Sequence, residues 1–201
     1  MKVFRTLTLV LSTLVSVMGM TDKATGISFP KVLKGLDICG VGCRKKGPIK
    51  VYSVGLYASG LKEKLSNLSQ SSKVALAALQ KGAGTDTPMS FLLEMNFKVG
   101  AEKMASAIAE GVEPRHTGDA SEVAALKDLI FKGVSGKGAA TKGTTFQFDC
   151  SNDGVGVSVD GKSQGSVGGS KLSSAFCNIY VDNNTVSPPL RKNCLSNWCL
   201  P

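Results

Sequence analysis

Two segments of alternating residues between Leu36 and Tyr57 do most to determine which folds are open to this chain. Gly47 and Pro48 separate them, and this dipeptide is typical of a tight turn. Side chains of a strand alternate between its two faces, so the second segment places Tyr52 on a face with apolar neighbours. The stretch therefore predicts two antiparallel strands joined by a short turn.

The first of these strands carries a candidate ligand site. Gly40 and Gly42 share a predicted face with Ile38 and Arg44, and two glycines on one face leave a trough where a ligand can approach the backbone. Arg44 would supply a charged, planar guanidinium with several hydrogen-bond donors, and Tyr52 would supply a hydroxyl. Together they suit a ligand with an apolar body and an acidic head group. The same residue types also fit an exposed turn arginine beside a core tyrosine.

Helical and strand patterns alternate along the rest of the chain. The expected helices are 61–80, 100–111, one opened by Asp119, 170–180 and a short one opened by Ser187. The further strands are expected at 89–97, 144–150, 155–159 and 162–167, with Asp-Gly turns between the last three. This order of elements is an α+β pattern.

Residues 1–19 are typical of a secretory signal peptide. Lys2 and Arg5 precede an apolar run that is shorter than the roughly 20 residues needed to cross a bilayer, and small residues follow it. We expect cleavage near Gly19 and Met20, with an uncleaved anchor as the alternative. The mature chain has no second run of spanning length, so we expect a protein of the secretory pathway or the extracellular space. In an organism with complex plastids, the same leader could begin a plastid-targeting signal.

Six cysteines follow the leader, an even number that permits disulfide bonds in a secreted chain. Cys39 and Cys43 lie four residues apart on a predicted strand, roughly 13 Å, whereas a disulfide needs Cα atoms within about 7 Å. Cys194 and Cys199 flank a short terminal segment and form the best local pair. We expect no metal site, because no Cys-x-x-Cys spacing occurs and the only histidine, His116, reads as a solvated loop residue.

Two asparagines match glycosylation acceptor motifs. Asn67 precedes Leu-Ser and Asn183 precedes Asn-Thr. These motifs are meaningful only if the chain enters a eukaryotic secretory route.

The charge distribution argues against nucleic acid as a partner. The formal net charge is +9, yet no dense run of lysine and arginine is interleaved with aromatic residues. The glycine-rich stretch 165–169 lacks the Gly-Lys-Ser/Thr ending of a phosphate loop, so no nucleotide or other cofactor is expected.

Four segments in order resemble the chalcone isomerase-like family, in its microbial rather than its plant flavonoid form. The first is Gly40-x-Gly42-x-Arg44 with Val51-Tyr52-x-x-Gly55-Leu56-Tyr57; the others are a Met-x-Phe strand with the helix from Gly100, the strands 142–169, and the last two helices. The resemblance covers residues 24–198 as one domain. It implies a curved antiparallel sheet with helices packed on one face, an open-faced sandwich with a pocket between the layers.

The resemblance also implies roles for individual residues. In the flavonoid enzymes an arginine holds a phenolate, and Arg44 matches it. Tyr52 stands where those enzymes carry a threonine, while Lys103 and Glu110 stand where they carry a tyrosine and an asparagine. Arginine with tyrosine at the first two places is similar to the fatty-acid-binding branch, where the pair clamps a carboxylate.

Three functions therefore remain open. The first is a non-catalytic binder of fatty acids or similar amphiphilic acids, held by Arg44 and Tyr52 with Gly40 and Gly42 beneath. The second is an intramolecular lyase (isomerase) that acts on a chalcone-like enone. The third is a structural domain whose pocket is filled by its own side chains.

Overall fold

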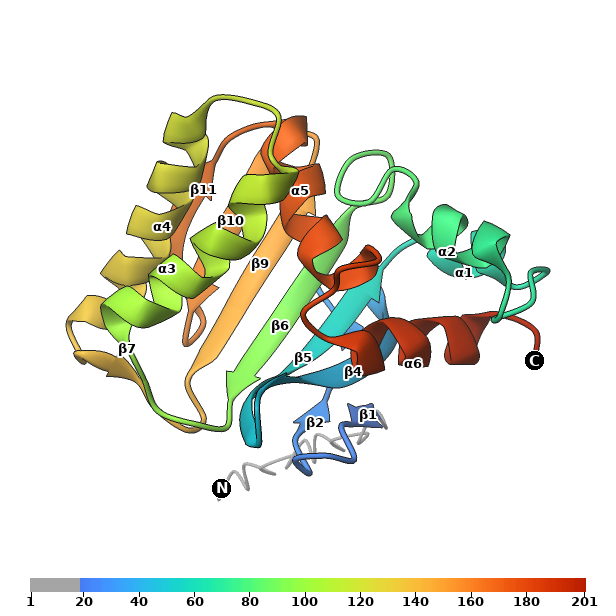
Figure 1. Ribbon diagram of the computed structural model, residues 1–201, viewed down its shortest axis with the longest axis horizontal. Helices are drawn as coiled ribbons and strands as arrows, with labels where there is room; N and C mark the ends of the chain where they lie inside the picture. Colours follow the sequence, from blue (N-terminus) through green and yellow to red (C-terminus); the bar gives the residue numbers. More distant parts are fainter. Residues whose placement is uncertain (1–18) are drawn as a thin grey trace, which may run out of the picture.

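A seven-stranded antiparallel sheet forms the centre of the computed structural model, which describes residues 19–201 (Figure 1). The predicted leader lies outside the described residues except for Gly19. In spatial order the strands are β11 (Lys162–Val167), β10 (Gly154–Val159), β9 (Thr145–Ser151), β6 (Met89–Met95), β5 (Ile49–Ala58), β4 (Leu36–Lys46) and β3 (Val32–Leu33). Two small pairs accompany it: β1 (Met20–Thr21) with β2 (Ser28–Phe29), and β7 (Val99–Gly100) with β8 (Ala139–Ala140).

The helices lie on one face of this curled sheet (Figure 1). They are α1 (Leu61–Leu65), α2 (Lys73–Gln80), α3 (Ala101–Val112), α4 (Ala120–Ser135), α5 (Ser170–Val181) and α6 (Pro188–Trp198), with a 3₁₀ turn at Glu113–Arg115. The expected α+β class and the one-sided helical layer are confirmed. Asp119 is confirmed as the N-cap of α4, since its carboxylate accepts a hydrogen bond from the Ser121 amide.

The main core lies between the sheet and the helices. Strand register places apolar side chains in rows, for example Val54 beside Leu93 and Leu93 beside Phe146. Towards α5, aromatic rings fill the interior: the ring centroids of Phe148 and Phe176 are 4.5 Å apart. Offset and tilted pairs at such separations add to the hydrophobic gain of burial. The centre of the fold is therefore packed with the protein's own rings.

A smaller apolar cluster covers the outer face of the sheet. It consists of buried residues from β2, β4 and β5, namely Phe29, Ile38, Val41 and Tyr57. The segment around β1 and β2 is held there by a buried polar contact, in which the Ser53 hydroxyl donates to the Asp22 carboxylate at 2.6 Å. The residues directly after the predicted leader are thus part of the folded domain.

A β-bulge in β4 changes one sequence expectation. Ile38 pairs with Tyr57 and Gly40 pairs with Leu56, so Cys39 is an extra residue in the strand. Ile38 therefore lies in the outer cluster, while Cys39 lies in the main core. The prediction that Ile38 shares a face with Gly40 is wrong, because the bulge reverses the alternation at this point.

The single helix predicted for residues 61–80 is also wrong, because the chain forms α1 and α2 with a loop between them. The Ser72 hydroxyl accepts a hydrogen bond from the Ala75 amide at 3.0 Å and begins α2. Serines favour such caps and turns over helix interiors. The loop also pairs with the C-terminus, where the Gln70 amide donates to the Leu200 carbonyl at 2.8 Å.

The side chain of His116 is buried, so the expectation that this is a solvated loop residue is wrong. Its side chain is 3% exposed, and its Nε2 atom lies 3.1 Å from the Glu122 carboxylate. The ring is held between the end of α3 and the start of α4, so its role in the described structure is to fasten this connection.

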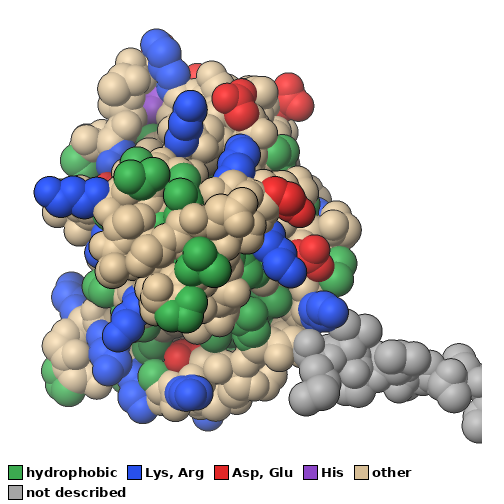
Figure 2. All heavy atoms as spheres, turned by 90° about the vertical axis from the view of Figure 1, so that its right-hand side faces the viewer, with side chains coloured by type: hydrophobic (Ala, Val, Ile, Leu, Met, Phe, Trp, Pro, Cys, Tyr) green, Lys and Arg blue, Asp and Glu red, His purple; other side chains and the backbone are tan. Residues whose placement is uncertain are grey.

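Lysine and arginine side chains are scattered over the face seen in Figure 2 and do not gather into one patch there. Among the described helices, none combines the length and the apolar character required to cross a bilayer.

Candidate ligand-binding site

A cavity of about 320 Å³ lies where the end of the β4–β5 hairpin meets the segment after β6 and the exposed side of α3. This volume is at the lower end of the range for small-molecule pockets. Its lining residues come from these elements and are Arg44, Lys46, Ile49, Val51, Tyr52, Phe97, Lys98, Val99, Gly100, Lys103, Met104, Ala107 and Glu110.

Arg44 and Tyr52 lie together at this cavity, as the sequence predicts. They are register partners on β4 and β5, so the strand pairing itself brings their side chains to the same face. The Arg44 guanidinium donates to the Tyr52 hydroxyl at 3.4 Å, and its central carbon lies 5.7 Å from the centre of the Tyr52 ring. This ring position is within the range of a cation–π contact.

Tyr180 extends this contact into the core. The hydroxyls of Tyr52 and Tyr180 are 3.0 Å apart, and both side chains are fully buried. The result is a chain of three polar groups from the cavity to α5, starting at Arg44. Because Tyr180 holds the hydroxyl of Tyr52 in place, the part of the site contributed by Tyr52 is preorganised.

The surroundings keep Arg44 charged. Burial alone would lower the pKa of the guanidinium, but Tyr52, Tyr180 and Glu110 more than offset it and raise the pKa above its usual value. Burial, followed by the neighbouring Tyr52, raises the pKa of Tyr180 well above its usual value. At neutral pH the site therefore presents a fixed cation beside neutral Tyr180.

The rim of the cavity is mostly basic. Lys46, Lys98 and Lys103 are exposed around it, and Glu110 is the only acid among the lining residues. No carboxylate in the described part of the chain lies within 4.0 Å of the Arg44 guanidinium. Arg44 is thus a half-buried cation whose close polar neighbour is the Tyr52 hydroxyl.

Lys103 and Glu110 line the same cavity as Arg44 and Tyr52. The resemblance indicated these four positions from segments well separated in sequence. Both Lys103 and Glu110 lie on α3, seven residues apart and therefore two turns along one side of the helix.

The trough predicted over Gly40 and Gly42 is not open, which corrects the sequence analysis. Helix α6 packs directly on both glycines: a Cβ atom at Gly40 would lie 2.7 Å from the Cys194 nitrogen, and one at Gly42 would lie 2.2 Å from the Leu190 nitrogen. The absence of side chains serves helix packing here and not ligand approach.

The structure does not bring Cys194 and Cys199 together as the predicted disulfide requires, and both are free thiols. Cys194 is buried within α6, whereas Cys199 is its C-cap residue five positions later and is partly exposed. Five residues on a helix turn the side chain to a different side, which separates the two sulfurs.

The two sequon asparagines are accessible. Asn67 lies in the loop between α1 and α2, and Asn183 lies between α5 and α6; both side chains are exposed. Their modification stays a prediction that depends on the leader.

Tyr180 is a site residue that the sequence reasoning missed. It follows Phe176 by four residues on the inward side of α5, whereas the sequence analysis names it only as the end of the expected helix 170–180. A buried tyrosine hydroxyl usually has a hydrogen-bond partner, and this rule could have marked Tyr180 as a member of a polar site.

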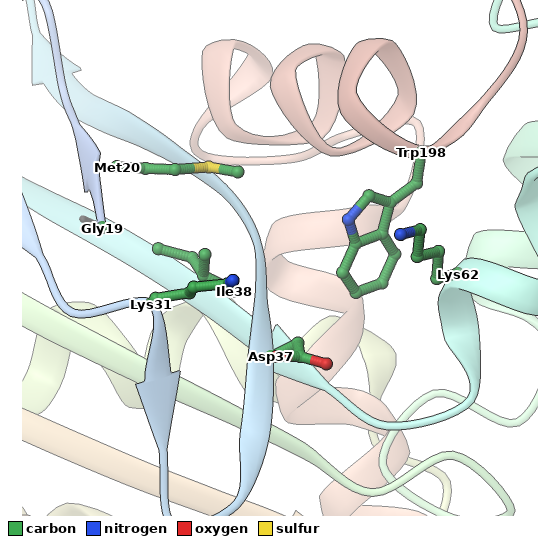
Figure 3. A pocket seen from close by; sticks show the side chains of 7 residues that line it. All are labelled: Gly19, Met20, Lys31, Asp37, Ile38, Lys62 and Trp198. Atoms are coloured by element: carbon green, nitrogen blue, oxygen red, sulfur yellow. The ribbon is translucent and has the colours of Figure 1, made fainter. Parts of the chain in front are cut away.

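A second hollow, of about 380 Å³, lies near the other end of β4 (Figure 3). The Trp198 ring at the end of α6 and the Lys62 side chain on α1 lie next to each other there, with Asp37 below them. Gly19 and Met20 border the same space. None of the residues that the sequence analysis proposed for ligand binding lines it.

Comparison with known proteins agrees with the fold described above. Among curated proteins, none matches the chain. A solved structure of a fatty-acid binding protein of Arabidopsis thaliana is similar in fold, with a TM-score of 0.70 and 22% sequence identity over 89% of this chain and 96% of that chain. A family model described as chalcone isomerase-like matches residues 23–196. Since that match spans well over half of the sequence, the chain belongs to the chalcone isomerase-like family.

Proposed function

We propose that this protein binds fatty acids or similar amphiphilic carboxylates without transforming them. The observation that carries the proposal is the Arg44 guanidinium, which lines a cavity, is half-buried and has no described carboxylate within 4.0 Å. Removing a cation from water is costly unless an anion or strong acceptors compensate for it. A ligand carboxylate placed against Arg44 and the Tyr52 hydroxyl would supply that compensation.

The walls of the cavity fit the rest of such a ligand. Val51, Val99 and Met104 provide an apolar surface beside Arg44, and the large side chains of Ile49 and Phe97 are 40% and 49% exposed at the rim. Exposed apolar side chains that gather at a hollow are typical of ligand-binding grooves. An alkyl chain that leaves the carboxylate site would cover them.

The charge of the rim favours an anionic ligand. Three lysines and one glutamate surround the cavity, so the local field attracts a carboxylate and speeds its approach. The fold relative from Arabidopsis thaliana is named a fatty-acid binding protein, which supports the same class of ligand.

Replacing Arg44 with alanine is the direct test. A charge-assisted bond to a carboxylate contributes about 1.5–3 kcal/mol, so Arg44→Ala should weaken fatty-acid binding about tenfold to a hundredfold in isothermal titration calorimetry. Tyr52→Phe should cost less, about 0.5–1.5 kcal/mol. Arg44→Lys should restore binding only in part, because an ammonium lacks the planar fork.

Two controls accompany this measurement. Lys162→Ala removes an exposed lysine on β11, which does not line the cavity, and should leave binding unchanged. The methyl ester of the same fatty acid should bind weakly to the unaltered protein and be nearly indifferent to Arg44→Ala. If ester and acid bind equally well, no carboxylate clamp exists.

A structural domain without a ligand is the second candidate, favoured by the aromatic packing of the interior. Phe91, Phe148 and Phe176 are fully buried where a deeper pocket between sheet and helices would lie. On this alternative, no fatty acid of any chain length binds, and lipid extraction of the purified protein followed by mass spectrometry returns nothing specific. Cyclisation of a chalcone that Arg44→Ala abolishes would instead support an isomerase.

A further inference from the structure

Cys39 and Cys194 meet at the contact between β4 and α6. Both side chains are 0% exposed and belong to the same packed core. A Cβ atom at Gly40, the residue next to Cys39, would lie 2.8 Å from the Cys194 sulfur, so this sulfur lies directly against the strand beside Cys39. The helix is fixed on the strand to either side of this contact. The Asn193 amide oxygen accepts a hydrogen bond from the Val41 amide at 2.8 Å, and the Asn197 side chain donates to the Cys39 carbonyl at 3.1 Å.

Cys150 and Cys177 form a second contact of the same kind, between β9 and α5. Both are buried in the same core, where α5 packs on β9, and the pKa of the Cys150 thiol responds to the side chains of Cys177 and of Ser173, one turn earlier on the helix. Ser173 in turn donates to the Gly84 carbonyl. A Cβ atom at Gly84 would lie 2.6 Å from the Cys177 sulfur, so the loop before β6 closes over this pair.

We propose that Cys39 with Cys194 and Cys150 with Cys177 form two disulfide bonds in the oxidised protein, while Cys43 and Cys199 stay as thiols. In each bond two thiols lose two protons and two electrons and form one sulfur–sulfur bond. A disulfide donor, such as oxidised glutathione or a thiol-oxidising enzyme, takes up both electrons and both protons and becomes two thiols. The structure with six thiols is the reduced form of the same fold.

The remaining cysteines are placed less well for pairing. Cys43 pairs in register with Ser53 and therefore faces away from Cys39, on the outer side of the sheet. Cys199 also influences the pKa of the Cys39 thiol, but more weakly than Cys194 does. A link between Cys39 and Cys199 is accordingly the competing outcome.

Burial determines when oxidation can occur. Removal from water raises the pKa of Cys39 and of Cys150 well above the usual value, and the partner thiols raise it further. Exchange requires the thiolate, so these groups react slowly once the domain is folded. We therefore place bond formation during folding, before α5 and α6 have closed over the sheet.

Oxidative refolding followed by peptide mapping tests the proposal. The reduced, unfolded protein is refolded in a glutathione redox buffer, its free thiols are alkylated, and the digest is analysed without reduction. We expect the peptides of Cys39 and Cys194 to be linked, those of Cys150 and Cys177 to be linked, and Cys43 and Cys199 to be alkylated. Six alkylated thiols, or a bond from Cys199 to Cys39 or Cys194, would overturn the pairing.

Serine variants supply a second readout. In oxidised protein, Cys39→Ser and Cys194→Ser should lower the thermal midpoint by similar amounts, and the double variant should lower it no further than either alone. Adding reductant should lower the thermal midpoint of the unaltered protein and so reduce its difference from the two single variants. Cys43→Ser is the control, and the difference between its thermal midpoint and that of the unaltered protein should be the same with and without reductant.

A variant that carries Cys43→Ser and Cys199→Ser keeps only the four proposed cysteines. It should refold to a species with no free thiol and the same two linked peptides, even if the single variants fail to fold. Any remaining alkylated thiol, or exchanged pairs among these four, would contradict the proposal.

Discussion

Phe176→Ala is expected to lower the free energy of unfolding by about 3–5 kcal/mol, the usual range for deletion of a buried phenylalanine ring. The Phe176 side chain is fully buried on α5, 4.5 Å from the Phe148 ring centre and 5.7 Å from that of Phe91. Its removal loses the burial of the ring and leaves a cavity that fixed neighbours on the sheet cannot fill. Urea denaturation under reducing conditions, monitored by circular dichroism, measures the change in the free energy of unfolding.

Phe131→Ala is the matched control. Phe131 is a phenylalanine on α4 that is 39% exposed, so the same deletion there should cost far less. Similar losses for both variants would mean that the rings between sheet and α5 do not form a tightly packed centre.

Gly42→Ala should destabilise the protein by about 3 kcal/mol or more, at the upper end for overpacking of a well-filled core. The added methyl group would lie 2.2 Å from the Leu190 nitrogen and 2.6 Å from its Cα atom. These are backbone atoms of α6, so no side-chain rotation can relieve the overlap and the helix must move away from β4. The same denaturation measurement should show it.

Gly136→Ala provides the comparison. Gly136 is the C-cap of α4, has a helical φ of −61°, and a Cβ atom there would meet nothing within 4 Å. Alanine at such a position restricts the unfolded chain and should be neutral or slightly stabilising. If Gly42→Ala were equally harmless, α6 would not lie against β4 as described.

The strands and the class of the fold were open to prediction from sequence because their signals are local. Alternation together with Gly47-Pro48 and the Asp-Gly turns gives β4, β5, β9, β10 and β11 nearly complete. The bulge at Cys39 could not be predicted from the sequence, because an extra residue in a strand is recognised only when the register with the partner strand is known. The break between α1 and α2 had a signal in the serines that precede Ser72.

The site was predictable in part for the same reason. Arg44 and Tyr52 are neighbours across one tight turn, so sequence distance alone brings them together. Tyr180 reaches them only through the packing of α5 on the sheet, and α6 fills the space over Gly40 and Gly42 through a contact between the two ends of the domain. Contacts at such sequence separations have no local pattern from which to read them.

The packing of the last helix on the first long strand has a consequence for biosynthesis. Leu190 and Cys194 leave the ribosome long after Gly40 and Gly42, whose backbone they cover in the folded domain. Pairings between distant segments form slowly and leave surfaces bare in the meantime. The inner side of β4 therefore stays open to water and to chaperones until α6 has emerged, and a chain that stops before α6 cannot complete the domain.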